Sequence, residues 1–180
     1  MMRMAQTVGT MVVTLLVTAC APMQQDGPRD PHDVQASPPG SATCLATSNA
    51  QNQTGASATN AARRKMGLAP VRANALLADV AAQHACDMAT RGLMSHRGSN
   101  STGPGPRVKA RGYAPVLTAE NIAAGPFNLQ RVLMEWNNSS GHLDNIAIPQ
   151  VRDFGIGQAV GSDGRTRFWA AVYAAPRSPG

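Results

Sequence analysis

The last third of the chain most constrains the fold, because it contains two strand-like segments separated by a short turn. Residues 153–160 and 165–173 are rich in Phe, Ile, Val, Trp and Ala, and Gly161-Ser162-Asp163-Gly164 lies between them. This pattern predicts an antiparallel hairpin. The helical patterns come earlier in the chain. Helices followed by a terminal hairpin predict an α+β domain, in which helices pack on a small, mostly antiparallel sheet.

The clearest helical pattern spans residues 75–91. Asn74 is a suitable N-cap and Gly92 a suitable C-terminal stop. The residues expected on its buried face recur at helical spacing: Leu77, Val80, Ala81, His84, Ala85 and Met88. A single histidine on an apolar helix face is most often a hydrogen-bonded core residue, so His84 is expected to be structural.

The remaining elements are predicted less sharply. Residues 60–66 are helix-like and end at Gly67, with no clear start. A short helix is expected from Pro106 to Gly112, then an extended segment over 113–118. Asn128 is a suitable cap for a helix over 129–137, on which Glu135 is expected to be exposed. A short turn or helix follows through Asn145-Ile146.

The first twenty residues resemble a secretory signal peptide. Arg3 precedes the apolar run 11–17, and the segment ends in Val17-Thr18-Ala19-Cys20, which resembles the lipobox of bacterial lipoproteins. On this interpretation Cys20 is acylated and anchors the protein to a membrane. Ala21, rather than Asp, then favours the outer membrane of a two-membrane bacterium. The alternative is an ordinary signal peptide with a chance cysteine.

Residues 21–43 are rich in Pro, Gly, Ser and Gln and are expected to form a disordered tether, with His32 as a solvated residue. The folded domain is expected over 44–176. Assigning Cys20 to lipid leaves Cys44 and Cys86, which an oxidising envelope would allow to pair. Two free buried thiols are the alternative.

The chain is basic, with a formal net charge of +6 and a pI near 10.0. Its arginines are scattered, with Arg63-Arg64-Lys65 as the single cluster, and no pattern of aromatic residues accompanies them. This distribution argues against nucleic acid as a partner. We therefore interpret the charge as solvated surface.

Several short motifs together resemble the bacterial branch of the CAP superfamily, whose name joins cysteine-rich secretory proteins, antigen 5 and pathogenesis-related 1, and whose domain is also called SCP. The resemblance covers roughly residues 59–173. It rests on the order and spacing of Asn60-x2-Arg63, Gly67-Leu68-Ala69-Pro70, Ala81-x2-His84-Ala85-x2-Met88-Ala89, Ser95-His96, Gly112-Tyr113, Glu120-Asn121-Ile122-Ala123-x-Gly125, Trp136-x2-Ser139-x-Gly141-His142-x2-Asn145-Ile146 and Phe154-Gly155-Ile156-Gly157. Membership implies a three-layer α-β-α sandwich.

The resemblance also implies a central cleft lined by two histidines and acidic residues. By match, the cleft residues are His96, Glu120, Asn121 and His142. Many eukaryotic members have a second cleft glutamate where this chain has Ser139. His96, His142 and Glu120 are candidate ligands for a divalent cation such as zinc. Two alternatives remain: a metal-free cleft for an anionic ligand, or a polar network without chemistry.

These features favour an exported, lipid-anchored, monomeric binding module of the bacterial cell envelope, with a lipid, glycan or protein as its ligand. One alternative is a hydrolase of envelope substrates that uses His96 or His142 as base, either together with Glu120 or with a metal-bound water as the nucleophile. Neither Ser95 nor Ser139 lies in a recognised nucleophile motif, which disfavours it. The second alternative is a structural envelope protein with a vestigial cleft.

Overall fold

The computed structural model describes residues 33–177. The expected signal peptide, Cys20, His32 and most of the expected tether lie outside this range. Within it, no helix combines the length and the apolar character needed to cross a membrane.

A five-stranded sheet forms the middle layer. Its strands are β2 (Thr43–Cys44), β3 (Arg72–Ala73), β5 (Pro115–Gly125), β6 (Asp153–Val160) and β7 (Arg167–Pro176). The order is β2-β6-β7-β5, and the short β3 pairs in parallel with β6. β6 and β7 form the predicted antiparallel hairpin. β5 pairs with β7 on one side only and is therefore an edge strand of this sheet.

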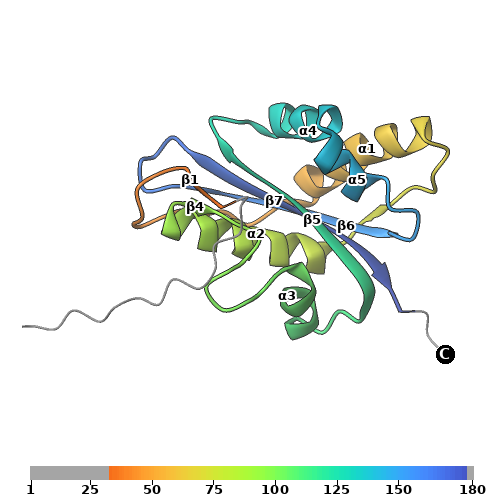
Figure 1. Cartoon of the computed structure of the whole chain (residues 1–180), viewed down its shortest axis with the longest axis horizontal. Helices are drawn as coiled ribbons and strands as arrows, with labels where there is room; N and C mark the ends of the chain where they lie inside the picture. Colours follow the sequence, from red (N-terminus) through yellow and green to blue (C-terminus); the bar gives the residue numbers. More distant parts are fainter. Residues whose placement is uncertain (1–32, 178–180) are drawn as a thin grey trace, which may run out of the picture.

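Helices cover both faces of the sheet, which gives the α-β-α layering expected from the resemblance (Figure 1). One face packs against α1 (Asn49–Lys65), α4 (Leu129–Asn138) and α5 (Ser140–Ile146), and the other against α2 (Ala75–Arg91) and α3 (Pro104–Ala110). Two hydrophobic cores lie on the two faces of the sheet, and alternate residues of β7 contribute to one or the other. Trp169 and Tyr173 belong to the α1 side, whereas Phe168 and Val172 belong to the α2 side.

Helix α2 has the predicted bounds and lies close against the hairpin. Asn74 caps it through a hydrogen bond from Leu77, and Gly92 ends it in the left-handed conformation at φ 65°. Two glycines of β6 allow the close approach. A Cβ at Gly155 would lie 2.2 Å from the backbone of Ala78, and one at Gly157 would lie 2.1 Å from the backbone of Ala82.

Helix α1 begins well before the helical pattern detected from residue 60. Ser48 accepts a hydrogen bond from the amide of Gln51 and caps its first turn. Gly55 packs against the ring of Phe154, and a Cβ there would lie 2.7 Å from that ring. Packing on the sheet therefore holds a segment whose polar residues give little helical signal on their own.

The expectation that Arg63 is solvated is wrong, because its side chain is fully buried. It donates hydrogen bonds to the backbone carbonyls of Ala69, Ile146 and Ile148. These carbonyls offset much of the cost of burying the guanidinium, whose Nη2 has no hydrogen-bond partner in the described residues. Arg63 thus ties α1 to the segment that follows α5.

The folded part starts earlier than the boundary expected at residue 44. β1 (Val34–Gln35) pairs with β4 (Leu93–Met94) to form a separate two-stranded sheet. The expected disulfide between Cys44 and Cys86 is confirmed, and it joins β2 to α2. Whether the residues before β1 form a tether stays a prediction.

Candidate functional site

The pair Glu120-Asn121 lies in the edge strand β5 and projects its two side chains to opposite faces of the sheet. Glu120 lies opposite Val172 of the α2 side, and Asn121 lies opposite Ala171 of the α1 side. This alternation is the ordinary geometry of a strand. The residues around β5 therefore form two groups, one on each face.

On the α2 face, the Glu120 carboxylate is buried and fully engaged, with a side chain that is 1% exposed. His96 Nδ1 lies 2.9 Å from its Oε1, and Arg107 forms an ion pair with its Oε2. His84 Nε2 lies 3.7 Å from Oε1. Both carboxylate oxygens thus have cationic or hydrogen-bonding partners.

These partners keep Glu120 ionised. Burial alone raises the pKa of this carboxyl, but the hydrogen bond with His96 and the nearby His84 and Arg107 outweigh burial and hold the pKa below its usual range. A buried carboxylate needs such compensation, and the guanidinium of Arg107 provides a full opposite charge.

His84 is a hydrogen-bonded core residue, as expected, but it also borders Glu120. Its Nε2 lies 2.9 Å from the carbonyl oxygen of Ser95, which can only accept, so Nε2 carries the hydrogen. Burial is the main cause that lowers the pKa of His84 to about 4. The imidazole is therefore neutral at pH 7, with Nδ1 as an acceptor.

On the other face, a network of amides covers the free edge of β5. Asn145 Nδ2 donates to the backbone carbonyl of Glu120 and to Oδ1 of Asn121. Asn121 in turn donates to the backbone carbonyl of His142 and to the hydroxyl of Tyr173. This network joins α5 to the sheet.

The imidazole of His142 lies on this second face. It is half-buried, with its ring centroid 6.4 Å from the Trp136 ring. Burial lowers its pKa, a hydrogen bond to the backbone of Ile122 opposes this, and a charge on His96 lowers the pKa further. His96 therefore acts electrostatically on the pKa of His142 across the edge of β5.

Of the predicted cleft residues, the structure thus brings His96 into contact with Glu120, and Asn121 into contact with the backbone of His142. Glu120 and the imidazole of His142 are on opposite faces of the sheet. Whether these four residues bind a ligand stays a prediction.

The divalent cation implied by the resemblance does not fit this arrangement. Both oxygens of Glu120 are engaged by His96 and Arg107. Within residues 33–177, no three His, Cys, Asp or Glu side chains are grouped so that they could hold a metal ion. The guanidinium of Arg107 supplies the positive charge that a cation would otherwise bring to the carboxylate.

The sequence alone assigns no role to two important residues of this site, Arg107 and Asn145. Arg107 lies on the short helix α3, where a lone arginine resembles a surface residue. The available signal was indirect: Glu120 lies in an apolar run, and a buried carboxylate needs a cation. Asn145 was part of a recognised motif, but nothing in its spacing indicated the edge of a strand.

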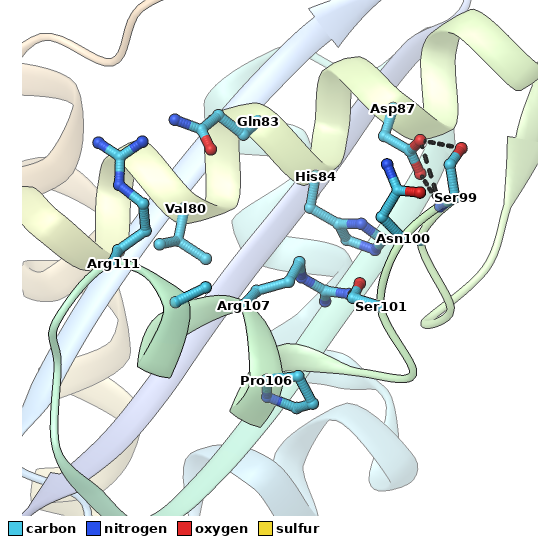
Figure 2. Close-up of a pocket in the computed structure, with 12 residues that line it drawn as sticks. Val80, Gln83, His84, Asp87, Ser99, Asn100, Ser101, Pro106, Arg107 and Arg111 are labelled. Atoms are coloured by element: carbon cyan, nitrogen blue, oxygen red, sulfur yellow. Dashed lines mark hydrogen bonds between the residues drawn. The ribbon is translucent and has the colours of Figure 1, made fainter.

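A cavity of about 260 Å³ adjoins the Glu120 cluster on the α2 face (Figure 2). It lies between α2, the loop 98–101 and α3, and both His84 and Arg107 line it. None of the four predicted cleft residues lines this cavity.

Comparison with known proteins agrees with this fold and these motifs. A model of the cysteine-rich secretory protein family, called CAP, matches residues 56–173, which is more than half of the chain. The chain therefore belongs to the CAP family.

Similar proteins include bacterial ones. The uncharacterized protein YkwD of Bacillus subtilis is 32% identical over 99 residues, which are 55% of this chain and 38% of YkwD. An extracellular protein of Bacillus anthracis that contains an SCP domain is 28% identical, with a TM-score of 0.61 over 70% of this chain and 40% of that one. This chain thus matches less than half the length of these two relatives.

An outer surface protein of Borrelia burgdorferi shares the fold over nearly its whole length. The TM-score is 0.63 at 20% identity, over 73% of this chain and 96% of that one.

Proposed function

We propose that this protein is a non-catalytic binding module of the bacterial cell envelope, exported and anchored through an acylated Cys20. Its binding site is the cleft at the edge of β5, where His96 approaches from the α2 face and His142 from the α1 face. The ligand is a lipid, a glycan or a partner protein of the envelope.

One observation carries the proposal: both carboxylate oxygens of Glu120 are engaged, one by His96 and one by Arg107, so neither is free to contact a substrate. A general base must reach the proton that it removes. A carboxylate that is 1% exposed and paired with a guanidinium is instead suited to hold its neighbours in place. His96 is the member of this cluster that reaches solvent, with 35% of its side chain exposed.

Export is supported by the lipobox-like sequence and the disulfide. Disulfides form and persist in oxidising compartments such as the bacterial envelope, and Cys44 is bonded to Cys86. The extracellular location of the Bacillus anthracis relative agrees with export of this chain.

The test is co-sedimentation of the full chain, carrying Cys20→Ser to remove the anchor, with purified peptidoglycan and separately with vesicles of bacterial phospholipids. We expect binding to one of these components, lost when His96 and His142 are both replaced by Ala. Glu135→Gln, an exposed change elsewhere on the molecule, is the control that should bind normally. Equal binding by the double histidine variant would place the ligand elsewhere and overturn the proposed cleft.

A hydrolase is the second candidate, and one contact favours it. A carboxylate that hydrogen-bonds Nδ1 of a histidine can orient the imidazole so that its other nitrogen acts as a base. His96 and Glu120 have this relation. However, within residues 33–177 no Ser, Thr or Cys side chain hydrogen-bonds the His96 imidazole, and Ser95 Oγ accepts instead from the amide of Arg97. A water molecule would therefore have to be the nucleophile.

Turnover assays separate the two functions. If purified protein releases products from peptidoglycan, phospholipids or peptides, and His96→Ala abolishes this while Glu135→Gln does not, the protein is an enzyme. The binding proposal predicts that the substrates are recovered unchanged.

A further inference from the structure

The cavity between α2 and α3 is lined by none of the four predicted cleft residues and has no part in the function proposed above. Figure 2 shows His84 and Asp87 on α2, with Ser99 of the loop hydrogen-bonded to Asp87, and Ser101 beside Arg107 of α3, below His84. Its volume is about 260 Å³. That is slightly smaller than the roughly 300–1,000 Å³ typical of sites for drug-sized molecules, so it suits a molecule of one ring.

Two buried polar atoms of the lining residues have no hydrogen-bond partner in the described part of the chain. They are Nδ1 of His84, whose side chain is 0% exposed, and Nε of Arg107, whose side chain is 12% exposed. Because His84 donates through Nε2 to Ser95, its Nδ1 accepts. Arg107 Nε only donates. Buried groups of this kind are normally satisfied, so each calls for a complementary partner.

A hydroxyl-rich molecule suits these two atoms, because each of its hydroxyl groups can both donate and accept. It can donate to His84 Nδ1 and accept from Arg107 Nε. A carboxylate or phosphate only accepts, and an ammonium group only donates, so neither satisfies both atoms.

The charges at the cavity also argue for a neutral ligand, since each charged lining side chain already has a partner of opposite charge. These pairs are Arg107 with Glu120, Arg111 with Asp79, and Asp87 with Arg91. An ionic ligand would have to compete with these pairs, whereas a neutral one would leave them intact.

The remaining lining residues offer what a sugar ring needs. Gln83 and Asn100 supply neutral amides, and Val80, Pro106 and Ala110 supply small apolar surfaces against which carbon–hydrogen groups can pack. We propose that this cavity binds a neutral, hydroxyl-rich molecule the size of a single sugar ring, held by hydrogen bonds to His84 Nδ1 and Arg107 Nε.

The test uses NMR of the isotope-labelled full chain with Cys20→Ser, titrated with glucose, N-acetylglucosamine and, as charged probes, inorganic phosphate and acetate. We expect one of the neutral sugars to shift the amide signals of residues 98–101 and of α3, and phosphate and acetate to leave them unchanged. The cleft residues His96 and His142 are not in the cavity lining, so their replacement should not abolish this binding.

Two variants probe the site. His84→Gln keeps a donor toward Ser95 and removes the acceptor at Nδ1, and should weaken binding about tenfold, the effect of losing one hydrogen bond. Ala110→Leu, at an exposed position on the cavity wall, should block the ligand without disturbing the core. Ala50→Leu, the same change at an exposed position on α1, is the matched control.

Saturable shifts that Ala110→Leu abolishes and Ala50→Leu preserves would support the proposal, even if His84→Gln fails to fold. The absence of shifts with both sugars at millimolar concentration would overturn it, as would shifts caused by phosphate or acetate in place of sugar. If Ala110→Leu loses sugar binding but still co-sediments with peptidoglycan or vesicles, the cavity and the proposed cleft are separate sites.

Discussion

At the scale of residues, Glu120 is best understood through its partners. It is one of two glutamates in the chain, and it is buried between Arg107, His96 and His84. Because Arg107 neutralises it directly, the carboxylate holds α3 and the loop that carries His96 against β5. His96 still keeps 35% of its side chain exposed, where the proposed ligand would contact it.

Arg107→Gln should therefore be strongly destabilising. It leaves the Glu120 carboxylate buried without its cation, and breaking a buried ion pair from one side costs about 3–5 kcal/mol. Urea denaturation at pH 7 would measure this loss.

Arg111→Gln is the matched control for this prediction. Arg111 follows α3 closely and pairs with Asp79, but the two side chains are 49% and 45% exposed. Such an exposed pair contributes about 0–1 kcal/mol. Equal losses for the two variants would show that Arg107 is not the essential partner of Glu120.

The buried His84 should make the protein sensitive to mild acid. In the unfolded chain it takes up a proton below about pH 6.5, but in the folded protein its pKa is about 4. The unfolded state therefore binds more protons between these values, and stability falls as the pH falls from about 6.5 to about 4. His142, whose pKa is also lowered, adds a contribution of the same sign.

His84→Gln should give a shallower loss of stability over this pH window than the wild-type protein. Urea denaturation at a series of pH values would show it. His142→Gln, which keeps His84, should retain the His84 part of the slope. An unchanged slope in His84→Gln would contradict the assignment of His84 as a buried neutral imidazole.

At the scale of elements, the edge strand β5 is protected on its open side by side chains. Asn145 binds the carbonyl of Glu120, and Trp136 Nε1 lies 3.4 Å from the carbonyl of Ile122. Covering an edge in this way prevents unwanted strand pairing. It also holds α4 and α5, and thereby His142, against the edge of β5.

Asn145→Ala removes two of the hydrogen bonds that protect the edge of β5 and leaves Oδ1 of Asn121 without its donor. We expect a loss of about 1–3 kcal/mol in the free energy of unfolding, together with faster amide hydrogen exchange in α5. Asn138→Ala, an exposed change at the end of α4, should have little effect on either. Unchanged exchange in α5 of the Asn145 variant would show that the amide network does not hold this helix.

Elements with a strong periodic pattern and clear caps were predictable from the sequence. α2 and the β6–β7 hairpin were of this kind. The start of α1 was not, because its first turns carry polar residues and Gly55, and its stability comes from packing on Phe154. β5 extends beyond the expected 113–118 because pairing with β7 overrides the weak strand preference of its Ala and Asn residues.

The site was predictable only through the family motifs. These motifs selected His96, Glu120, Asn121 and His142, but could not indicate that Glu120 and Asn121 point to opposite faces. That follows from the strand, whose extent was underestimated. Arg107 and Asn145 act through contacts across the fold, which sequence spacing does not encode.

At the scale of the whole molecule, a single central sheet organises two helical layers, and one disulfide joins the short strand β2 to α2. Cys44 and Cys86 are 42 residues apart. Closing a loop of this length restricts the unfolded chain and is worth about 3–4 kcal/mol in the entropic model.

Reduction should therefore lower the melting temperature of the chain that carries Cys20→Ser, as scanning calorimetry with and without dithiothreitol would show. A further Cys44→Ala, Cys86→Ala variant should melt at the lower temperature and be insensitive to the reductant. A wild-type melting temperature that reductant leaves unchanged would mean that the bridge adds no stability.

We propose, for the molecule as a whole, an anchored envelope protein that holds a ligand and does not transform it. Native mass spectrometry of the full chain, purified from the membrane of its own cells, tests this most directly. We predict a mature chain that begins at an acylated Cys20 and carries an intact envelope molecule, which is lost from the His96→Ala, His142→Ala variant. A chain without lipid at Cys20, or one that releases a cleaved product of its ligand, would contradict it.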